Sequence, residues 1–224
     1  MALLALSGVL CAWTAGAVPA ESKPDTKWGG QFGQFDAQDK ASPPAKGGLL
    51  FVGSSTIRLW DLKKSFPALP ALNRGFGGST LAELNQHRER LVLAYAPKTI
   101  VLYSGDNDVA HGASAEEVFG EFKSFAQWVR EKLPEARLIV LSIKPSVARW
   151  KLWDVMNEAN RKMREYAGGA TGVTFLDCAS AMMGPDGQPR KELLREDGLH
   201  LNEAGYALWA GLLAPLLGAP PATR

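Results

Sequence analysis

The amino-acid sequence predicts an α/β protein with three layers, in which helices cover both faces of a central parallel sheet. Two observations predict this class. Short apolar runs, rich in β-branched and aromatic residues, alternate along the chain with longer segments whose apolar residues recur at helical spacing. Neither an internal repeat nor a second composition regime interrupts this alternation, so one folded domain is expected.

The apolar runs have the composition of strands that are buried on both faces and bounded by turn residues. They span residues 49–52, 71–73, 99–103, 138–142 and 173–176. Between them, stripes of apolar residues predict amphipathic helices. These helices are expected over 81–92, 118–129 and 152–163, with a last helix over about 203–217. Pro97 and Pro134 end two of them just before the next strand.

The composition is that of a globular chain and excludes other classes. With 224 residues, of which 46% are hydrophobic and 21% charged, the chain can build a large core without a disulfide or a metal. The net charge of +2, with both signs interspersed, lacks the basic footprint of a nucleic-acid-binding protein, so no nucleic-acid partner is expected. Cys178 follows an apolar run and is expected to be a buried small hydrophobe.

The amino-terminal segment has the features of a secretory signal peptide. Residues 1–20 contain no charged side chain and end in small-residue sites, which predicts cleavage near Ala20 and a secreted or periplasmic protein without stable membrane insertion. An uncleaved membrane anchor is the less favoured alternative. We then expect a polar arm over 21–48 that lies on the domain surface, the domain over 49–218 and a tail over 219–224.

Candidate functional residues follow the predicted strands. Ligands bind at the carboxyl ends of the strands in open parallel sheets. Ser55 follows the first strand, Gly78 the second and Asn107 the third, while Asp197 and His200 precede the last helix. Each alone is typical of a turn or a helix cap. Their joint occurrence at one rim of the sheet favours a shared site.

These residue types suit nucleophilic catalysis. A serine hydroxyl needs a neighbouring base, and a neutral histidine serves near pH 7. His200 is the candidate base and Asp197 the carboxylate that orients it, since a spacing of three residues lets both side chains project to one side. Donors for an oxyanion would be the backbone amides of Ser55 and Gly78 and the side-chain amide of Asn107. The other histidines, at positions 87 and 111, are expected at the surface.

The pattern resembles the SGNH (GDSL-type) esterases and lipases. That family has a serine in G-D-S, a glycine in a G-G-D-T-like stretch, an asparagine in G-x-N-D and a terminal D-x-x-H, and the resemblance covers about residues 49–216. Ser54 replaces the usual aspartate of the first block, and Ser79 replaces the aspartate after the glycine. Neither departure affects a residue with a chemical role, but Ser54 is left as an alternative nucleophile.

The resemblance implies a flavodoxin-like α/β/α sandwich with a five-stranded parallel sheet. It further implies a carboxylic ester hydrolase that forms an acyl-enzyme on Ser55, with Asp197 and His200 completing the catalytic set and with no cofactor or metal. Outside the arm, no connection is long and apolar enough to form a lid, so short acyl groups are expected. The alcohol half is left open among a sugar acetate, a lysophospholipid and a simple ester.

Other functions fit parts of the sequence. Serine hydrolysis with the α/β-hydrolase elbow is disfavoured, because the segment around Ser55 lacks the second glycine of G-x-S-x-G. A metal site would draw on acidic residues near Asn107 together with Asp197 and His200, but the chain has only three histidines and no H-E-x-x-H motif. A catalytically silent, secreted carbohydrate-binding module on the same fold is the remaining alternative. It would use a stacking platform made of Arg149, Trp150 and Trp153.

Overall fold

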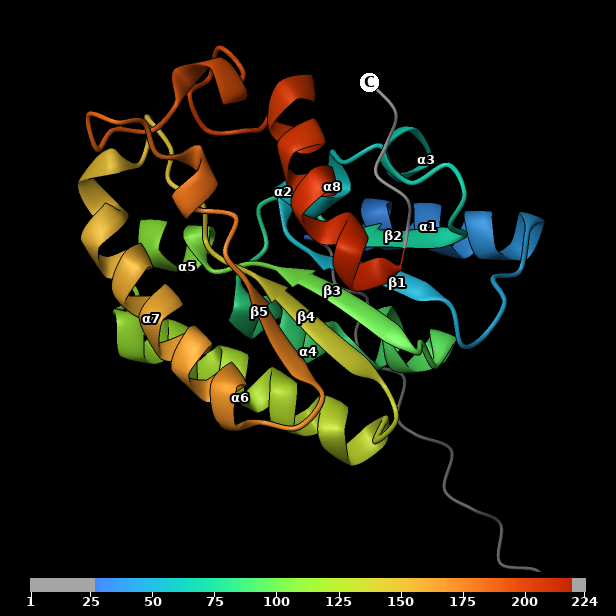
Figure 1. Ribbon diagram of the computed structural model, residues 1–224. Helices are drawn as coiled ribbons and strands as arrows, with labels where there is room; N and C mark the ends of the chain where they lie inside the picture. The colour runs from blue at the N-terminus through green and yellow to red at the C-terminus, as the bar shows by residue number, and fades with distance from the viewer. Residues whose placement is uncertain (1–26, 219–224) are drawn as a thin grey trace, which may run out of the picture.

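The computed structural model describes residues 27–218, so the predicted signal peptide and the tail lie outside the described residues. Its centre is a five-stranded sheet in the order β2-β1-β3-β4-β5, with every pairing parallel (Figure 1). The strands are β1 (Leu49–Gly53), β2 (Ala71–Gly75), β3 (Thr99–Tyr103), β4 (Arg137–Leu141) and β5 (Val173–Leu176). The predicted fold class is confirmed, and each predicted strand is present within two residues of its expected bounds.

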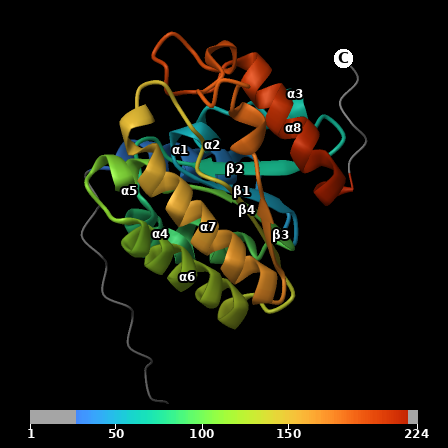
Figure 2. The ribbon, with the colours of Figure 1, turned by 60° about the vertical axis from the view of Figure 1, so that its left-hand side comes forward.

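Helices form the two outer layers, on opposite sides of the sheet in Figures 1 and 2. One face packs against α4 (Leu81–Leu91), α6 (Ala115–Lys132) and α7 (Trp153–Gly169), and the other packs against α2 (Ser55–Arg58), α3 (Leu62–Ser65) and α8 (Glu203–Leu217). Alternate strand residues serve the two cores: Leu50 and Val52 point to the first, whereas Phe51 between them points to the second. The remaining helical elements are α1 (Gly29–Ala41), α5 (Asp106–Ala110), η1 (Leu93–Tyr95), η2 (Trp150–Leu152), η3 (Ser180–Met182) and η4 (Lys191–Leu193).

Two helices begin at capping boxes that the sequence contains. The Thr80 side chain accepts a hydrogen bond from the Glu83 backbone amide, and the Glu83 carboxylate accepts one from the Thr80 backbone amide. Ser114 and Glu117 do the same for α6. The cap at Thr80 determines where the loop after β2 ends, and this loop carries Gly78.

The amino-terminal arm contains a helix that the sequence did not suggest. Gly-rich composition favours irregular backbone, yet residues 29–41 form α1. Trp28 and Phe32 are buried, and both rings pack against Phe76, with centroids 5.0 and 5.5 Å away. The helix is therefore stabilised by tertiary packing of a few aromatic side chains rather than by its intrinsic propensity.

An ion pair joins α1 to the sheet edge. The Arg74 guanidinium at the end of β2 is buried and paired with Asp39 of α1. The Tyr95 hydroxyl accepts a hydrogen bond from Arg74 at 2.8 Å and donates one to Asp39 at 2.6 Å. Because a buried charge is costly without partners, this arrangement holds α1 against the edge strand.

His87 departs from the expected surface position. It is half-buried, and its ring lies 4.8 Å from Phe32 and 6.2 Å from Phe76, centroid to centroid. The face of α4 that looks polar in the sequence is covered by α1. His111 is exposed, as predicted, and Cys178 is fully buried with a free thiol whose pKa is raised by burial. Among residues 27–218, no helix is both long and apolar enough to span a bilayer.

Candidate active site

A tight turn after β1 places Ser55 at the start of α2. Gly53 has φ of 142°, and a Cβ at this position would lie 1.8 Å from the Tyr103 carbonyl oxygen, so only glycine fits. The next two serines differ in environment. The Ser54 side chain is fully buried, whereas Ser55 is half-buried and its hydroxyl oxygen lies 3.1 Å from His200 Nε2. Of the two serines, Ser55 is the one that contacts the histidine.

Asp197 and His200 are joined within one turn before α8. The Asp197 Oδ2 atom lies 2.6 Å from His200 Nδ1, while Oδ1 accepts hydrogen bonds from the backbone amides of Leu199 and His200, each at 2.9 Å. The hydrogen bond from the His200 side chain is the main reason that the pKa of Asp197 lies well below its usual range. A fully ionised carboxylate therefore faces the imidazole at neutral pH.

The loop after β2 is tied to both neighbouring segments. The Phe76 amide donates to the Gly53 carbonyl at 2.9 Å, and Asn107 Nδ2 donates to the Ser79 carbonyl at 2.9 Å. Gly78, between these two contacts, has φ of 75°, a conformation that glycine adopts without strain. The structure thus brings the segments of Ser55, Gly78 and Asn107 together at the carboxyl ends of β1, β2 and β3.

A buried cluster of charges lies behind Asn107. Asp106 Oδ2 is 3.1 Å from Arg149 Nη1 and 3.4 Å from Lys144 Nζ, and the side chains of Asp106 and Lys144 are almost fully buried. Burial lowers the pKa of Lys144, an effect that the Asp106 carboxylate opposes. Arg149 Nη2 also donates to Asn107 Oδ1 at 2.9 Å. The sequence suggests Arg149 only for the stacking platform of the alternative function, so this cluster was not predicted. The available signal was a lysine and an arginine following a predicted strand.

Asp108 has a structural contact rather than one with the histidine. Its Oδ1 and Oδ2 atoms accept from the backbone amide of Leu81, at 2.9 and 3.1 Å, which satisfies a donor in the first turn of α4. Burial raises its pKa to about 6, and the hydrogen bond from Leu81 opposes that rise. This acidic residue therefore links α5 to α4, and among residues 27–218 no group of three or more His, Cys, Asp or Glu side chains is placed to hold a metal ion.

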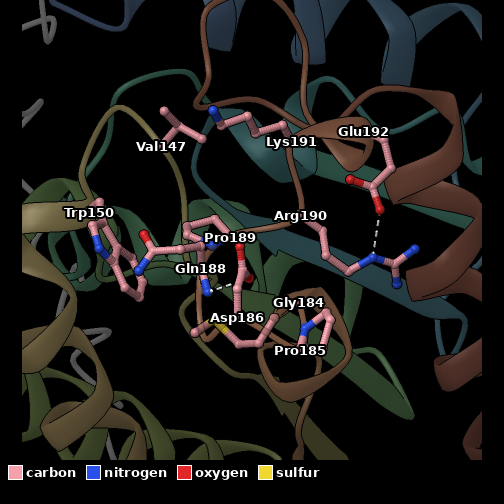
Figure 3. A pocket seen from close by; sticks show the side chains of 11 residues that line it. Val147, Trp150, Gly184, Pro185, Asp186, Gln188, Pro189, Arg190, Lys191 and Glu192 are labelled. Atoms are coloured by element: carbon pink, nitrogen blue, oxygen red, sulfur yellow. Dashed lines mark hydrogen bonds and ion pairs between the residues drawn. The ribbon is translucent and has the colours of Figure 1, made fainter.

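A cavity of about 850 Å³ lies between Trp150 and the segment over 183–192 (Figure 3). Its wall combines the indole with charged and amide side chains, among them Asp186, Gln188 and Lys191. Trp150 and Trp153 are stacked, with centroids 6.1 Å apart and ring planes at 15°. The loop that carries Trp150 is bonded to the turn after Asp197, because the Ala148 amide donates to the Gly198 carbonyl at 3.0 Å. The cavity therefore adjoins the turn of the candidate site.

Comparisons with known proteins show the family to which the chain is related. Residues 59–208 match the model of the GDSL-like Lipase/Acylhydrolase family, a range that begins just after Ser55. The chain is 31% identical over 191 residues to the platelet-activating factor acetylhydrolase IB subunit alpha1 of Bos taurus, covering 81% of this chain and 78% of that protein. It is 29% identical over 196 residues to subunit alpha2 of Homo sapiens, covering 82% and 80%.

Solved structures share the fold. A GDSL-like lipase from Bacteroides thetaiotaomicron superposes with a TM-score of 0.71 at 18% identity, covering 84% of this chain and 97% of that chain. A variant of an acetyl-xylooligosaccharide esterase from Geobacillus Stearmophilus superposes with a TM-score of 0.64 at 19% identity, covering 80% and 98%. With the family model matched over most of the domain, the chain belongs to the GDSL-like lipase/acylhydrolase family and is an ester hydrolase.

Proposed function

We propose that the protein hydrolyses short-chain carboxylic esters in two steps through an acyl-enzyme on Ser55. The observation that carries this proposal is the continuous line of contacts from Ser55 Oγ to His200 Nε2 at 3.1 Å, and from His200 Nδ1 to Asp197 Oδ2 at 2.6 Å. An ionised Asp197 can only accept, so the proton of a neutral His200 resides on Nδ1. Nε2 is then left unprotonated and oriented to receive the serine proton.

In the first step, Ser55 Oγ attacks the ester carbonyl while His200 Nε2 takes the hydroxyl proton. Asp197 stabilises the imidazolium that results. Collapse of the tetrahedral intermediate breaks the bond to the alcohol oxygen, and His200 returns the proton to the departing alcohol. In the second step, a water molecule gives a proton to His200 Nε2 and attacks the acyl carbon. Collapse of the second tetrahedral intermediate breaks the bond to Ser55 Oγ, His200 returns the proton to that oxygen, and the carboxylic acid leaves.

In the tetrahedral intermediate, the negative charge on the former carbonyl oxygen must be stabilised by hydrogen-bond donors that are held in place. We assign this task to the backbone amides of Ser55 and Gly78 and to the side-chain amide of Asn107. Two observations support the assignment. Ser55 begins α2, so its amide lies at the amino end of a helical turn. Asn107 is almost fully buried and bonded to the residue after Gly78, which holds the two donors at one place.

Because the chain is an ester hydrolase, the main question for experiment is which serine is the nucleophile. The Ser55→Ala variant should lose nearly all hydrolysis of p-nitrophenyl acetate, with at least about a thousandfold lower kcat. Ser54→Ala is the matched control and should retain activity, because the Ser54 side chain is buried away from His200. A fluorophosphonate should label Ser55 in peptide mapping. An adduct on Ser54 would reverse the assignment, and no adduct together with full activity of Ser55→Ala would refute the acyl-enzyme.

The signal peptide belongs to the same proposal. Residues 1–20 predict export, and amino-terminal sequencing of the protein from its native host should find a chain beginning near Glu21. A chain that retains residues 1–20 in the membrane fraction would support the uncleaved anchor instead.

A further inference from the structure

The orientation of the Asn107 side-chain amide is determined by its hydrogen-bonding neighbours. The two ends of a primary amide have nearly the same shape, but only the NH₂ end donates hydrogen bonds. In the structure, Nδ2 faces the Ser79 carbonyl oxygen, which only accepts, and Oδ1 faces the Arg149 guanidinium, which only donates. A flipped amide would place two acceptors together on one side and two donors on the other. The pair of neighbours therefore permits one orientation.

Among residues 27–218, the hydrogen bonds of the Asn107 amide leave one of its donors free. Nδ2 carries two hydrogens, and one of them is used by Ser79 at 2.9 Å. Oδ1 is engaged by Arg149 Nη2 at 2.9 Å. The second Nδ2 hydrogen is the donor that the proposed oxyanion hole requires. Arg149 determines which end of the amide supplies it, and the cation on the oxygen end also polarises the amide toward stronger donation.

Arg149 is itself fixed by the buried charges. Its guanidinium is a rigid fork: Nη2 bonds Asn107, while Nη1 lies 3.1 Å from the carboxylate of the preceding residue, Asp106. The side chain of Arg149 is 19% exposed, and that of Asp106 only 6%. Lys144 provides Asp106 with a second cation, so the carboxylate is held in place without relying on Arg149 alone.

We propose that Arg149 is a positioning residue, which acts on the reaction through the Asn107 amide rather than by touching the substrate. This inference rests on the proposed function, in which Asn107 donates to the oxyanion. The proposed role of Arg149 also differs from that of the neighbouring Trp150. Trp150 lines the cavity of Figure 3, whereas Arg149 does not.

The test is a double-mutant cycle between Arg149→Met and Asn107→Ala, with p-nitrophenyl acetate as substrate. Alone, Arg149→Met should lower kcat about 10- to 100-fold and leave KM within about twofold, because an interaction made only in the transition state is weakened. In the Asn107→Ala background, the same change should lower kcat by no more than about twofold, since no amide is left to orient.

A conservative variant and a control sharpen the test. Arg149→Lys keeps the charge but lacks the fork, so it should recover part of the kcat that Arg149→Met loses. Lys151→Met removes an exposed cation two residues away, in η2, and should leave kcat unchanged. Thermal unfolding of every variant reports whether the fold persists, and Arg149→Lys serves for the cycle if Arg149→Met does not fold.

Three results would overturn the inference. A raised KM at constant kcat would make Arg149 a substrate-binding residue. Equal losses in the wild-type and Asn107→Ala backgrounds would mean that the two side chains act independently. Full activity of both single variants at position 149 would mean that Arg149 does not influence kcat through the orientation of the Asn107 amide. Full activity of Asn107→Ala by itself would instead refute the oxyanion role in the proposed function, so the two failures are distinguishable.

Discussion

At the scale of single residues, the candidate site depends on a few short contacts around His200. Asp197 lies on the surface side of the imidazole, with its side chain 47% exposed, and Ser55 lies on the inner side. A carboxylate so exposed contributes little to stability. Its effect is instead local, because one oxygen organises the turn through two backbone amides and the other holds the imidazole.

Asp197→Asn should therefore leave the fold intact and slow the reaction. The amide can keep the two backbone contacts through its oxygen but offers NH₂ to His200 Nδ1, which favours the wrong tautomer and removes the charge that stabilises the imidazolium. We expect kcat for p-nitrophenyl acetate to fall by up to about 10,000-fold with an unchanged unfolding temperature. A folded variant with nearly wild-type kcat would mean that another group orients His200.

At the scale of elements, α1 and the loop after β2 form one unit. Gln31 Oε1 accepts a hydrogen bond from the Gly77 amide at 2.9 Å, and the Trp28 ring lies against Gly78, where an added Cβ would be 3.9 Å from it. The residue beside the proposed oxyanion donor is thus held from outside by a helix. Without that acceptor, the Gly77 amide loses its partner and the loop has more freedom.

We expect Gln31→Ala to reduce kcat about 3- to 10-fold while lowering the free energy of unfolding by only about 1 kcal/mol, the typical net value of one hydrogen bond. Gln34→Ala is the matched control, since Gln34 is an exposed glutamine of the same helix. Steady-state kinetics and urea unfolding measure the two effects. Identical kcat values for both variants would show that the hydrogen bond from Gly77 to Gln31 does not influence the reaction.

At the scale of the whole molecule, the surroundings of the candidate site combine apolar and charged side chains. The aromatic side chains of the arm are used in packing, with Trp28 and Phe32 buried against Phe76. The cavity beside the candidate site carries charges of both signs on its wall, including Asp186 and Lys191. We expect walls of this mixed character to favour short acyl groups over long aliphatic ones.

The specificity constant should consequently be highest for acetyl to butyryl esters and fall at least about tenfold at octanoyl, a difference of about 1.4 kcal/mol in transition-state binding. A series of p-nitrophenyl esters from about two to sixteen carbons measures this dependence. The same series with a Trp28→Ala variant serves as a control for the arm. A maximum at about ten carbons or more would contradict the small acyl site and place an apolar wall elsewhere in the chain.

Much of this architecture could be predicted from the sequence because it depends on local patterns. A strand that is apolar on both faces, such as 99–103, is expected where helices cover both faces of the sheet. The stripes of apolar residues at helical spacing predict those helices. The order of elements then brings Ser55, Asn107 and His200 to the carboxyl ends of the strands, since parallel strands all end at one edge. The catalytic roles of these residues remain predictions that the experiments above test.

Other features were decided by contacts between distant segments, which no local pattern encodes. Helix α1 forms from a Gly-rich arm because Phe32 packs against Phe76. Phe32 also covers His87, which α4 alone would leave exposed to solvent. The pairing of Arg149 with Asn107 joins residues 42 positions apart through side chains whose direction depends on loop geometry. Sequence alone determined the fold and the candidate site residues; only the tertiary structure decided how the oxyanion side of that site is held, because long-range packing and buried charge pairs exist only in the folded chain.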